Sequence, residues 1–362
     1  MEVFFYSTGC GDAARITFKD YNKRTNHVLI DSGFERTFRN LLYEELKSLH
    51  DKGETIALWI VSHIHDDHIG GVIGYISAVQ KKLLPEMVER WWYNPPRTLQ
   101  NLLSDQVHAS ISQPASILQG DALAAYLSAR PADAMQTIIS GSTPHEIAGL
   151  NITVISPTQV ELNKLRSKYQ APGKPLESTE DGQISEAKGM RKRDYSITVE
   201  QHKQTISAED LNIENGSSIA MITEFHGFKI LWLADAHPGV IIQSLRNLGY
   251  DRENPFICDW VKVAHHGSAA NNTTELYNMI QCNNYLISVN GDNRHGLPNK
   301  AAICNILHSR ARPKMQHYKF YFTHGDRILR SISTVEGDDV FDRLNFSIYY
   351  PDNPLWVKAD GG

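Results

Sequence analysis

The sequence predicts an α/β protein that carries metal-ligand residue types at the ends of its strands. Apolar, strand-like segments alternate with segments of helical periodicity along most of the 362 residues. An apolar run at 55–61 stops at a cluster of histidine and aspartate residues, and a buried strand followed by such residues recurs twice later. The composition, 41% hydrophobic and 21% charged, allows a large core in one large or two ordinary domains.

Charge and composition exclude several classes of protein. A net charge of -5 argues against a broad basic surface for non-specific nucleic-acid binding, although bound metal ions can supply positive charge where a phosphate sits. The start of the chain does not resemble a signal peptide, and the sequence has no apolar run of about 18 residues, so we expect a cytoplasmic protein without membrane association. The cysteines lack CxxC spacing and are expected to be reduced and mostly buried: Cys10, Cys258, Cys282 and Cys304.

The most informative motif follows the strand at 55–61. Alternation along an extended chain puts His63 and His65 on one side, so both imidazoles can reach one ion. Asp67 and His68 follow where the chain turns, and a Gly-Gly pair lets the backbone pass close to the site before a helix expected at 72–84. The motif therefore predicts two neighbouring metal ions.

The spacing of His63, His65, Asp67 and His68 between a strand and a helix resembles the signature of the metallo-β-lactamase superfamily. The resemblance implies an α/β fold of the αββα sandwich type, with two mixed β-sheets packed face to face and helices outside. It also implies that the first two histidines bind one metal ion and the Asp-His pair the other. Asp31, after a strand expected at 27–30, is interpreted as orienting a histidine or backbone amides, or alternatively as closing a turn.

Two later strands supply the remaining candidate ligands. The strand at 228–234 ends at Asp235, where a carboxylate can bridge two ions, and the strand at 260–264 runs into His265 and His266. We expect His265 to be the ligand and His266 the helper, with the reverse assignment left open. His237 is a further residue that could approach the site. The predicted metal ligands are the imidazole and carboxylate side chains at these strand ends: His63, His65, Asp67, His68, Asp235 and His265.

This ligand set predicts hydrolytic chemistry. Imidazole and carboxylate ligands suit two divalent ions, zinc or manganese above all, with iron(II) also compatible. Two ions can share a hydroxide by lowering the pKa of bound water from about 15.7 toward about 7. Beside the metals, the expected catalytic residues have distinct roles. Asp67 holds an ion, His266 protonates the leaving oxygen or binds a phosphate oxygen, Ser268 adds hydrogen bonds, and His295 points into the site.

Three further blocks narrow the resemblance. Residues 9–13, 262–268 and 288–298 resemble the metallo-β-lactamase domain of the competence protein ComEC and its stand-alone relatives. That likeness implies a phosphodiesterase or nuclease, with a phosphodiester such as DNA or RNA as substrate. In the last block the family often has Gly-His-Pro, whereas this chain has Gly-Leu-Pro preceded by His295. No further histidine is identified for the first metal site, because His108, His145 and His202 do not follow suitable strands, so water or substrate is expected to complete it.

Two alternatives stay open at the level of sequence. One is a small-molecule esterase, lactonase or phosphocholine esterase that uses the same ions. The other is a non-catalytic subunit of a DNA-processing or defence complex. A homodimer, or association with other DNA-processing or defence proteins, is compatible with each hypothesis.

The expected domain organisation is one metallo-β-lactamase domain at 1–330 with a C-terminal extension at 331–362 that packs on it or mediates association. A Leu- and Ala-rich segment at 98–127 is expected to form cap helices. A polar segment around 161–211 is expected to be a mobile insertion. It contains a basic cluster at 188–193, interpreted as a solvated loop or as a group that grips phosphate.

Overall fold

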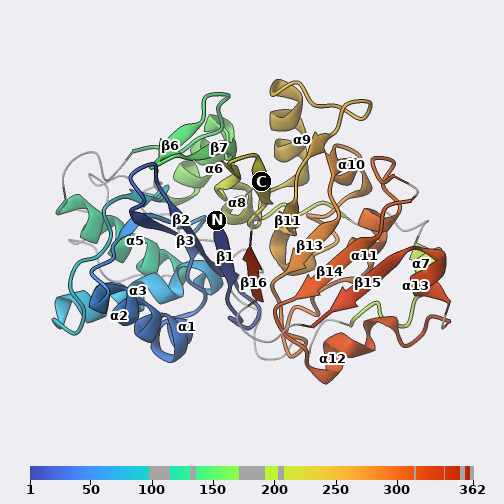
Figure 1. Cartoon of the computed structure of the whole chain (residues 1–362), viewed down its shortest axis with the longest axis horizontal. Helices are drawn as coiled ribbons and strands as arrows, with labels where there is room; N and C mark the ends of the chain where they lie inside the picture. The colour runs from blue at the N-terminus through green and yellow to red at the C-terminus, as the bar shows by residue number, and fades with distance from the viewer. Residues whose placement is uncertain are drawn as a thin grey trace.

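The computed structural model describes residues 1–97, 115–130, 136–170, 192–202, 208–313, 315–337, 339–350 and 355–358. Two large mixed β-sheets pack face to face, with helices on their outer sides (Figure 1). Apolar side chains from both sheets form the layer between them, with Val3, Ile16 and Val28 on one side and Met221 and Ile230 on the other. The αββα sandwich expected from the sequence is confirmed.

The first sheet has six strands in the order β16-β1-β2-β3-β4-β5. Their bounds are β1 (Glu2–Phe5), β2 (Ala13–Lys19), β3 (Thr25–Asp31), β4 (Ile56–Ile60), β5 (Trp91–Trp92) and β16 (Leu355–Lys358). The pairs from β16 to β3 are antiparallel, whereas β3, β4 and β5 run parallel. The carboxyl ends of β3 and β4 therefore lie at the same edge of the sheet.

The second sheet has eight strands in the order β15-β14-β13-β11-β9-β8-β7-β6. Their bounds are β6 (His145–Ile147), β7 (Leu150–Ser156), β8 (Ala220–Phe225), β9 (Phe228–Trp232), β11 (Trp260–Lys262), β13 (Asn284–Ile287), β14 (Tyr318–Phe322) and β15 (Phe346–Tyr349). The run from β9 to β15 is parallel, so the carboxyl ends of β9, β11 and β13 meet at one edge. β10 (Phe256–Ile257) and β12 (Ile280–Gln281) form a separate pair.

Helices cover the outer face of each sheet. Against the first sheet lie α1 (Glu35–Thr37), the π-helical turn η1 (Phe38–Leu42), α2 (Tyr43–Asp51), α3 (Asp66–Gln80) and α5 (Ala115–Ser128). The other helices are α6 (Gln159–Gln170), α7 (Val199–His202), α8 (Ile213–Gly216), α9 (Pro238–Asn247), α10 (Thr274–Tyr277), α11 (Lys300–Leu307), α12 (Arg327–Arg330) and α13 (Val340–Arg343). The 3₁₀ turns are η3 (Ala264–Gly267) and η4 (Ser331–Ser333). Ile241 of α9 and Ile303 of α11 join the core formed with Val261 and Tyr285.

The helix after the metal motif begins earlier than the sequence suggests. We expect it at 72–84, but α3 begins at Asp66, so Asp67 and His68 lie in its first turn. Gly71 makes this possible, because a Cβ atom there would lie only 2.4 Å from the carbonyl oxygen of Ser32. The Gly-Gly pair thus lets the start of α3 pack directly on the loop after β3.

Parts of the segments expected at 98–127 and 161–211 are helical in the structure. α5 occupies the end of the first segment. α6 overlaps the start of the second segment, and α7 lies inside it. Residues 98–114, 171–191 and 203–207 are outside the described residues, and so are His108 and most of the basic cluster. From the tail, β16 pairs with β1, and its Leu355 and Val357 side chains join the core between the sheets.

Two expectations drawn from composition, on the cysteines and on membrane-spanning helices, can be compared with the structure. The four cysteines are free and buried, as expected. No helix among the described residues is both long enough and apolar enough to cross a bilayer.

Candidate metal centre

The site lies where strand ends of the two sheets meet. β4 leads to His63, β9 to Asp235, and β11 to His265 and His266. A backbone hydrogen bond joins the ends of β9 and β11, since His265 N–H donates to Ala234 O at 2.8 Å. Asp31, Ala234, His265 and His266 all have left-handed φ values between 44° and 54°. Such backbone is costly for these residues and persists only where surrounding structure imposes it.

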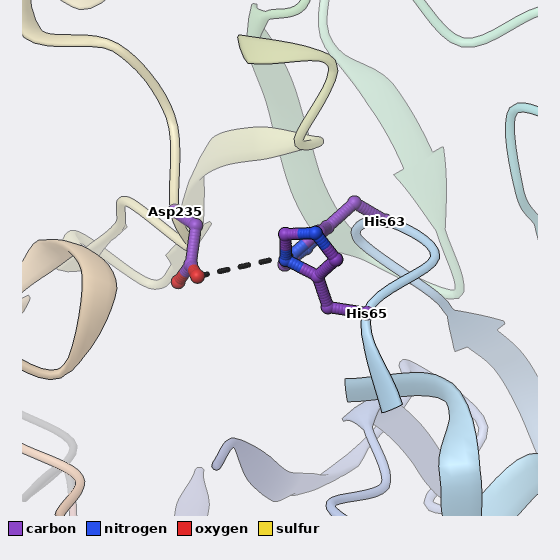
Figure 2. A group of neighbouring side chains, drawn as sticks. All are labelled: His63, His65 and Asp235. Atoms are coloured by element: carbon purple, nitrogen blue, oxygen red, sulfur yellow. Dashed lines mark hydrogen bonds and ion pairs between the residues drawn. The ribbon is translucent and has the colours of Figure 1, made fainter. Parts of the chain in front are cut away.

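The first group of ligand-type side chains is His63, His65 and Asp235 (Figure 2). Nε2 of His63 lies 3.7 Å from Oδ2 of Asp235 and 3.1 Å from Nδ1 of His65. Burial, together with the charge on His68, lowers the pKa of His63 well below its usual value, so its ring is neutral and can offer a lone pair to a cation. The structure therefore brings together the residues that the sequence assigns to one ion.

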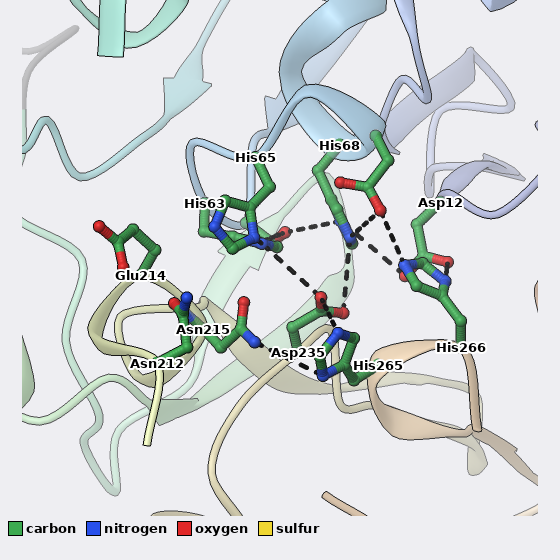
Figure 3. Close-up of polar contacts among 12 residues, drawn as sticks. Asp12, His63, His65, His68, Asn212, Glu214, Asn215, Asp235, His265 and His266 are labelled. Carbon is green, nitrogen blue, oxygen red and sulfur yellow. Dashed lines mark hydrogen bonds and ion pairs between the residues drawn. The ribbon is translucent and has the colours of Figure 1, made fainter. Parts of the chain in front are cut away.

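The second group is Asp67, His68 and His266, and a third overlapping group joins His68 and Asp235 to Asp12. Oδ2 of Asp67 lies 3.1 Å from Nε2 of His266. Nε2 of His68 lies 3.5 Å from Oδ1 of Asp235. Asp235 thus turns one oxygen toward His63 and the other toward His68, as a carboxylate that bridges two cations would (Figure 3).

Three of the imidazole rings are held in the same way. Their Nδ1–H groups donate to acceptors outside the cluster: His68 to Oδ2 of Asp31 at 2.8 Å, His266 to the carbonyl of Ser288 at 2.9 Å, and His265 to Oδ1 of Asn271 at 2.8 Å. Their Nε2 atoms consequently point inward. Metal-binding histidines are usually fixed by such an outer hydrogen bond, which sets the tautomer and the ring orientation.

Asp31 positions the cluster rather than joining it. Its carboxylate accepts hydrogen bonds from the backbone N–H of Ser62 at 2.7 Å, from the Ser62 hydroxyl at 2.8 Å and from His68. These contacts connect the end of β3 to the end of β4 and to the first turn of α3. They favour the interpretation of Asp31 as a positioning residue over that of a simple turn residue.

The two adjacent histidines face different parts of the cluster, which does not decide between the two assignments. The sequence predicts His265 as the ligand and His266 as the helper. The structure places His266 with Asp67 and His68, whereas Nε2 of His265 faces Oδ2 of Asp235 at 3.7 Å. Adjacency alone could not decide between them, because the left-handed backbone at both residues determines where each ring points. Which ring binds an ion stays a prediction.

Asp12 and Lys262 belong to the site and are missed by sequence reasoning. They form a buried ion pair beneath the second group, and Oδ1 of Asp12 lies 3.5 Å from Nδ1 of His266. Burial raises the pKa of Asp12, but Lys262 and His266 outweigh burial and lower the pKa overall, so Asp12 is a carboxylate. The sequence did contain one indication: Lys262 is a lone lysine in a buried apolar strand, and a buried lysine requires a charged partner.

The other predicted site residues lie around the cluster. Ser268 is buried and its N–H donates to the carbonyl of His265 at 2.8 Å, which closes the turn after the two histidines. His295 is half-buried, and burial, followed by the charge on Arg294, lowers its pKa to about 4. The charge of Asp67 also acts on His295, so this residue lies close to the cluster. Among the described residues, neither Ser268 nor His295 is part of the three ligand-type groups.

Three further histidines have structural roles. His237 donates from Nε2 to the carbonyl of Asn212 at 2.8 Å. His145 packs edge-on against Trp92, with ring centroids 4.9 Å apart. His202 lies in α7 and is buried. Within the described part of the chain, none of them joins a ligand-type group.

The buried polar atoms of the cluster fit divalent cations. Nε2 of His68, Oδ1 of Asp235 and Oδ1 of Asp12 are buried and have no hydrogen-bond partner among the described residues. Buried polar atoms without partners are costly, and the three residues that carry them form one of the ligand-type groups. The mixture of imidazole nitrogen and carboxylate oxygen suits zinc, manganese or iron.

Comparisons with known proteins find similarity to one superfamily over part of the chain. Residues 21–166 match the family model of the metallo-beta-lactamase superfamily. Among solved structures, the metallo-beta-lactamase fold protein YhfI from Bacillus subtilis is 10% identical, with 98% of this chain and 99% of that chain covered and a TM-score of 0.37. A mutant of the CmlA beta-hydroxylase is also 10% identical, with 99% of this chain covered and a TM-score of 0.41.

The present chain covers 54% of that CmlA chain. The search of curated proteins finds no match. Over residues 21–166 the chain is similar to the metallo-β-lactamase superfamily, and its two-sheet sandwich and His-x-His-x-Asp-His motif agree with that similarity.

Proposed function

We propose that this protein is a hydrolase that uses two divalent ions, zinc or manganese, to cleave phosphodiesters, with DNA or RNA as the substrate class. The observation that carries the proposal is the position of Asp235. Its two oxygens face histidines of different groups, His63 at 3.7 Å and His68 at 3.5 Å. A buried carboxylate shared in this way supports a two-ion centre over a single structural ion.

When bound, two ions would lower the pKa of water and offset the negative charge that develops on a phosphate. The protein's own residues fix the geometry: Asp31 and the carbonyl of Ser288 hold His68 and His266 with Nε2 inward. His265 is the residue placed to reach a substrate, because 27% of its side chain is exposed, against 2% for His266. As an imidazolium, whose Nδ1–H stays bonded to Asn271, His265 can give up its Nε2 proton, and we assign to it the donation of that proton to the leaving oxygen.

An arginine beside the centre supports an anionic substrate. Arg294 is exposed and directly precedes His295, which lies within electrostatic reach of Asp67. The guanidinium of Arg193 donates to the carbonyl groups of Gly291 and Asn293, and so anchors the loop that carries Arg294. Guanidinium groups suit phosphate oxygens because they offer several donors in a plane. The ComEC-like sequence blocks, which include this loop, point to the same substrate class.

The test is a substrate panel assayed with zinc or manganese. It comprises bis-p-nitrophenyl phosphate, single- and double-stranded DNA, RNA, a lactone and a β-lactam. We expect turnover of the phosphodiesters. His68→Ala should reduce the rate by at least about 100-fold, because it removes an inward Nε2 from the centre. His50→Ala is the matched control, since His50 is an exposed histidine on α2 and should leave the rate unchanged.

Arg294→Ala separates the substrate classes. If Arg294 binds phosphate, this variant should raise KM for the nucleic acids and for bis-p-nitrophenyl phosphate and leave KM for a neutral lactone unchanged. Turnover of the lactone alone would overturn the phosphodiesterase assignment. Equal activity of His68→Ala and the native protein would overturn the role of the whole centre.

A further inference from the structure

The histidine motif supplies too few ligands for the first ion. Because Asp235 also belongs to the third group, with Asp12 and His68, an ion held by His63 and His65 has only those two imidazoles to itself. Zinc in a catalytic site usually has three protein ligands and an open position for water or substrate. A further ligand therefore has to come from elsewhere in the chain or from solvent.

Asn215 lies at this position in the fold. It belongs to α8, its side chain is buried, and the chain that follows is tied to the metal motif because Ile219 N–H donates to Ser62 O at 2.9 Å. The neighbouring residue, Glu214, interacts electrostatically with His65. In Figure 3 the Asn215 side chain lies between His265 and the His63–His65 pair, with its oxygen turned toward the pair.

The orientation of the Asn215 amide is determined by Asp210. Nδ2 of Asn215 donates to Oδ2 of Asp210 at 2.7 Å. A flipped amide would place its oxygen against that carboxylate, which has no hydrogen to donate. Asp210 is itself held by Asn271, whose Nδ2 donates to it at 2.9 Å. The Asn215 oxygen consequently faces away from Asp210, and among the described residues this buried atom has no hydrogen-bond partner.

We propose that Oδ1 of Asn215 is the missing ligand of the ion held by His63, His65 and Asp235. This inference rests on the metal centre of the proposed function. An amide oxygen in place of a third imidazole makes the site a mixed nitrogen and oxygen site. Such a site binds zinc less tightly than an all-histidine site and is more tolerant of manganese, which accepts carbonyl oxygen readily.

Two substitutions at one position test the proposal. Asn215→Ala removes both the oxygen and the Nδ2 donor. Asn215→Asp keeps an oxygen in the ligand position but removes the donor to Asp210. We measure zinc stoichiometry by elemental analysis and affinity by competition with a chromophoric chelator, and record the visible spectrum of the cobalt(II) form. Denaturation midpoints of the metal-free variants report whether each one folds.

If Asn215 is a ligand, the native protein binds two zinc ions and Asn215→Ala loses at least tenfold in affinity for one of them, with a changed cobalt spectrum. Asn215→Asp retains that affinity within about threefold. If Asn215 only anchors Asp210, Asn215→Asp is as weak as Asn215→Ala, and the proposal is wrong. Native affinity in Asn215→Ala overturns it as well. Absence of zinc from the native protein overturns the metal centre itself, which distinguishes the two failures.

A crystal structure of the native protein with zinc provides a test that needs no variant. The proposal requires Oδ1 of Asn215 at about 2.0–2.2 Å from the ion, the range of oxygen ligands to zinc. A separation beyond about 3 Å would exclude direct ligation.

Discussion

Asp31→Asn is the substitution whose effect on metal binding follows most directly from the structure. In the native protein, Oδ1 of Asp31 accepts from the backbone N–H of Ser62 at 2.7 Å, and Oδ2 accepts from Nδ1–H of His68 at 2.8 Å. The amide of an asparagine has one acceptor and one donor group in place of two acceptors. If the amide oxygen stays on Ser62, the NH₂ group faces Nδ1 of His68. His68 must then carry its proton on Nε2, the atom that faces Asp235.

The magnitude follows from the contact that is lost. A hydrogen bond to a charged group contributes about 1.5–3 kcal/mol, and about 1.4 kcal/mol corresponds to tenfold in affinity. Asp31→Asn should therefore weaken the ion held by His68 by about 10–100-fold, the usual cost of removing an outer partner of a metal-binding histidine. The ion held by His63 and His65 should weaken less, because Asp31 reaches His63 only indirectly, through the Ser62 hydroxyl and through His68 and Asp235.

The assay is zinc titration against a chromophoric chelator, with fits for two sites. Asp51→Asn is the matched control, since Asp51 lies at the end of α2 with 64% of its side chain exposed. It should leave both affinities at the native value. Native affinity at both sites in Asp31→Asn would show that the tautomer of His68 is not set by Asp31, and the reasoning would be wrong.

Three further predictions concern the fold around the centre. Gly71→Ala should destabilise the protein by about 1–3 kcal/mol in urea unfolding, because the new Cβ would meet the Ser32 carbonyl at 2.4 Å; native stability would contradict that packing. Lys262→Met should cost about 3–5 kcal/mol in the metal-free protein, since it leaves the Asp12 carboxylate buried without its cation, and an unchanged urea midpoint would contradict the pairing. His27 has a pKa lowered by burial, so the folded state resists a proton that the unfolded state takes up below about pH 6.5. The metal-free native protein should therefore lose more stability between pH 7 and pH 5.5 than His27→Gln does, and parallel curves would refute this.

Much of the fold and the metal motif could be predicted from local sequence. The apolar run before His63 and the alternation that pairs it with His65 are properties of one short strand and the residues after it. The strand that delivers Asp235 was likewise visible, because hydrophobic periodicity identifies strands wherever one face or both are buried. The start of α3 was misplaced, since the two glycines that suggest a loop are required by close packing, Gly70 against the backbone of Phe34 and Glu35 and Gly71 against Ser32.

Tertiary structure alone decided which distant residues complete the centre. The sequence by itself determined that His63, His65 and Asp67 would lie together, because they are held by a few consecutive backbone bonds. Asp12 and Asn215 come from other segments, and neither follows the pattern of a strand that ends in ligands. Their roles depend on two sheets whose strand ends meet and on buried hydrogen bonds that fix each side chain. Such contacts link residues far apart in the chain, so they cannot be predicted from any local sequence pattern.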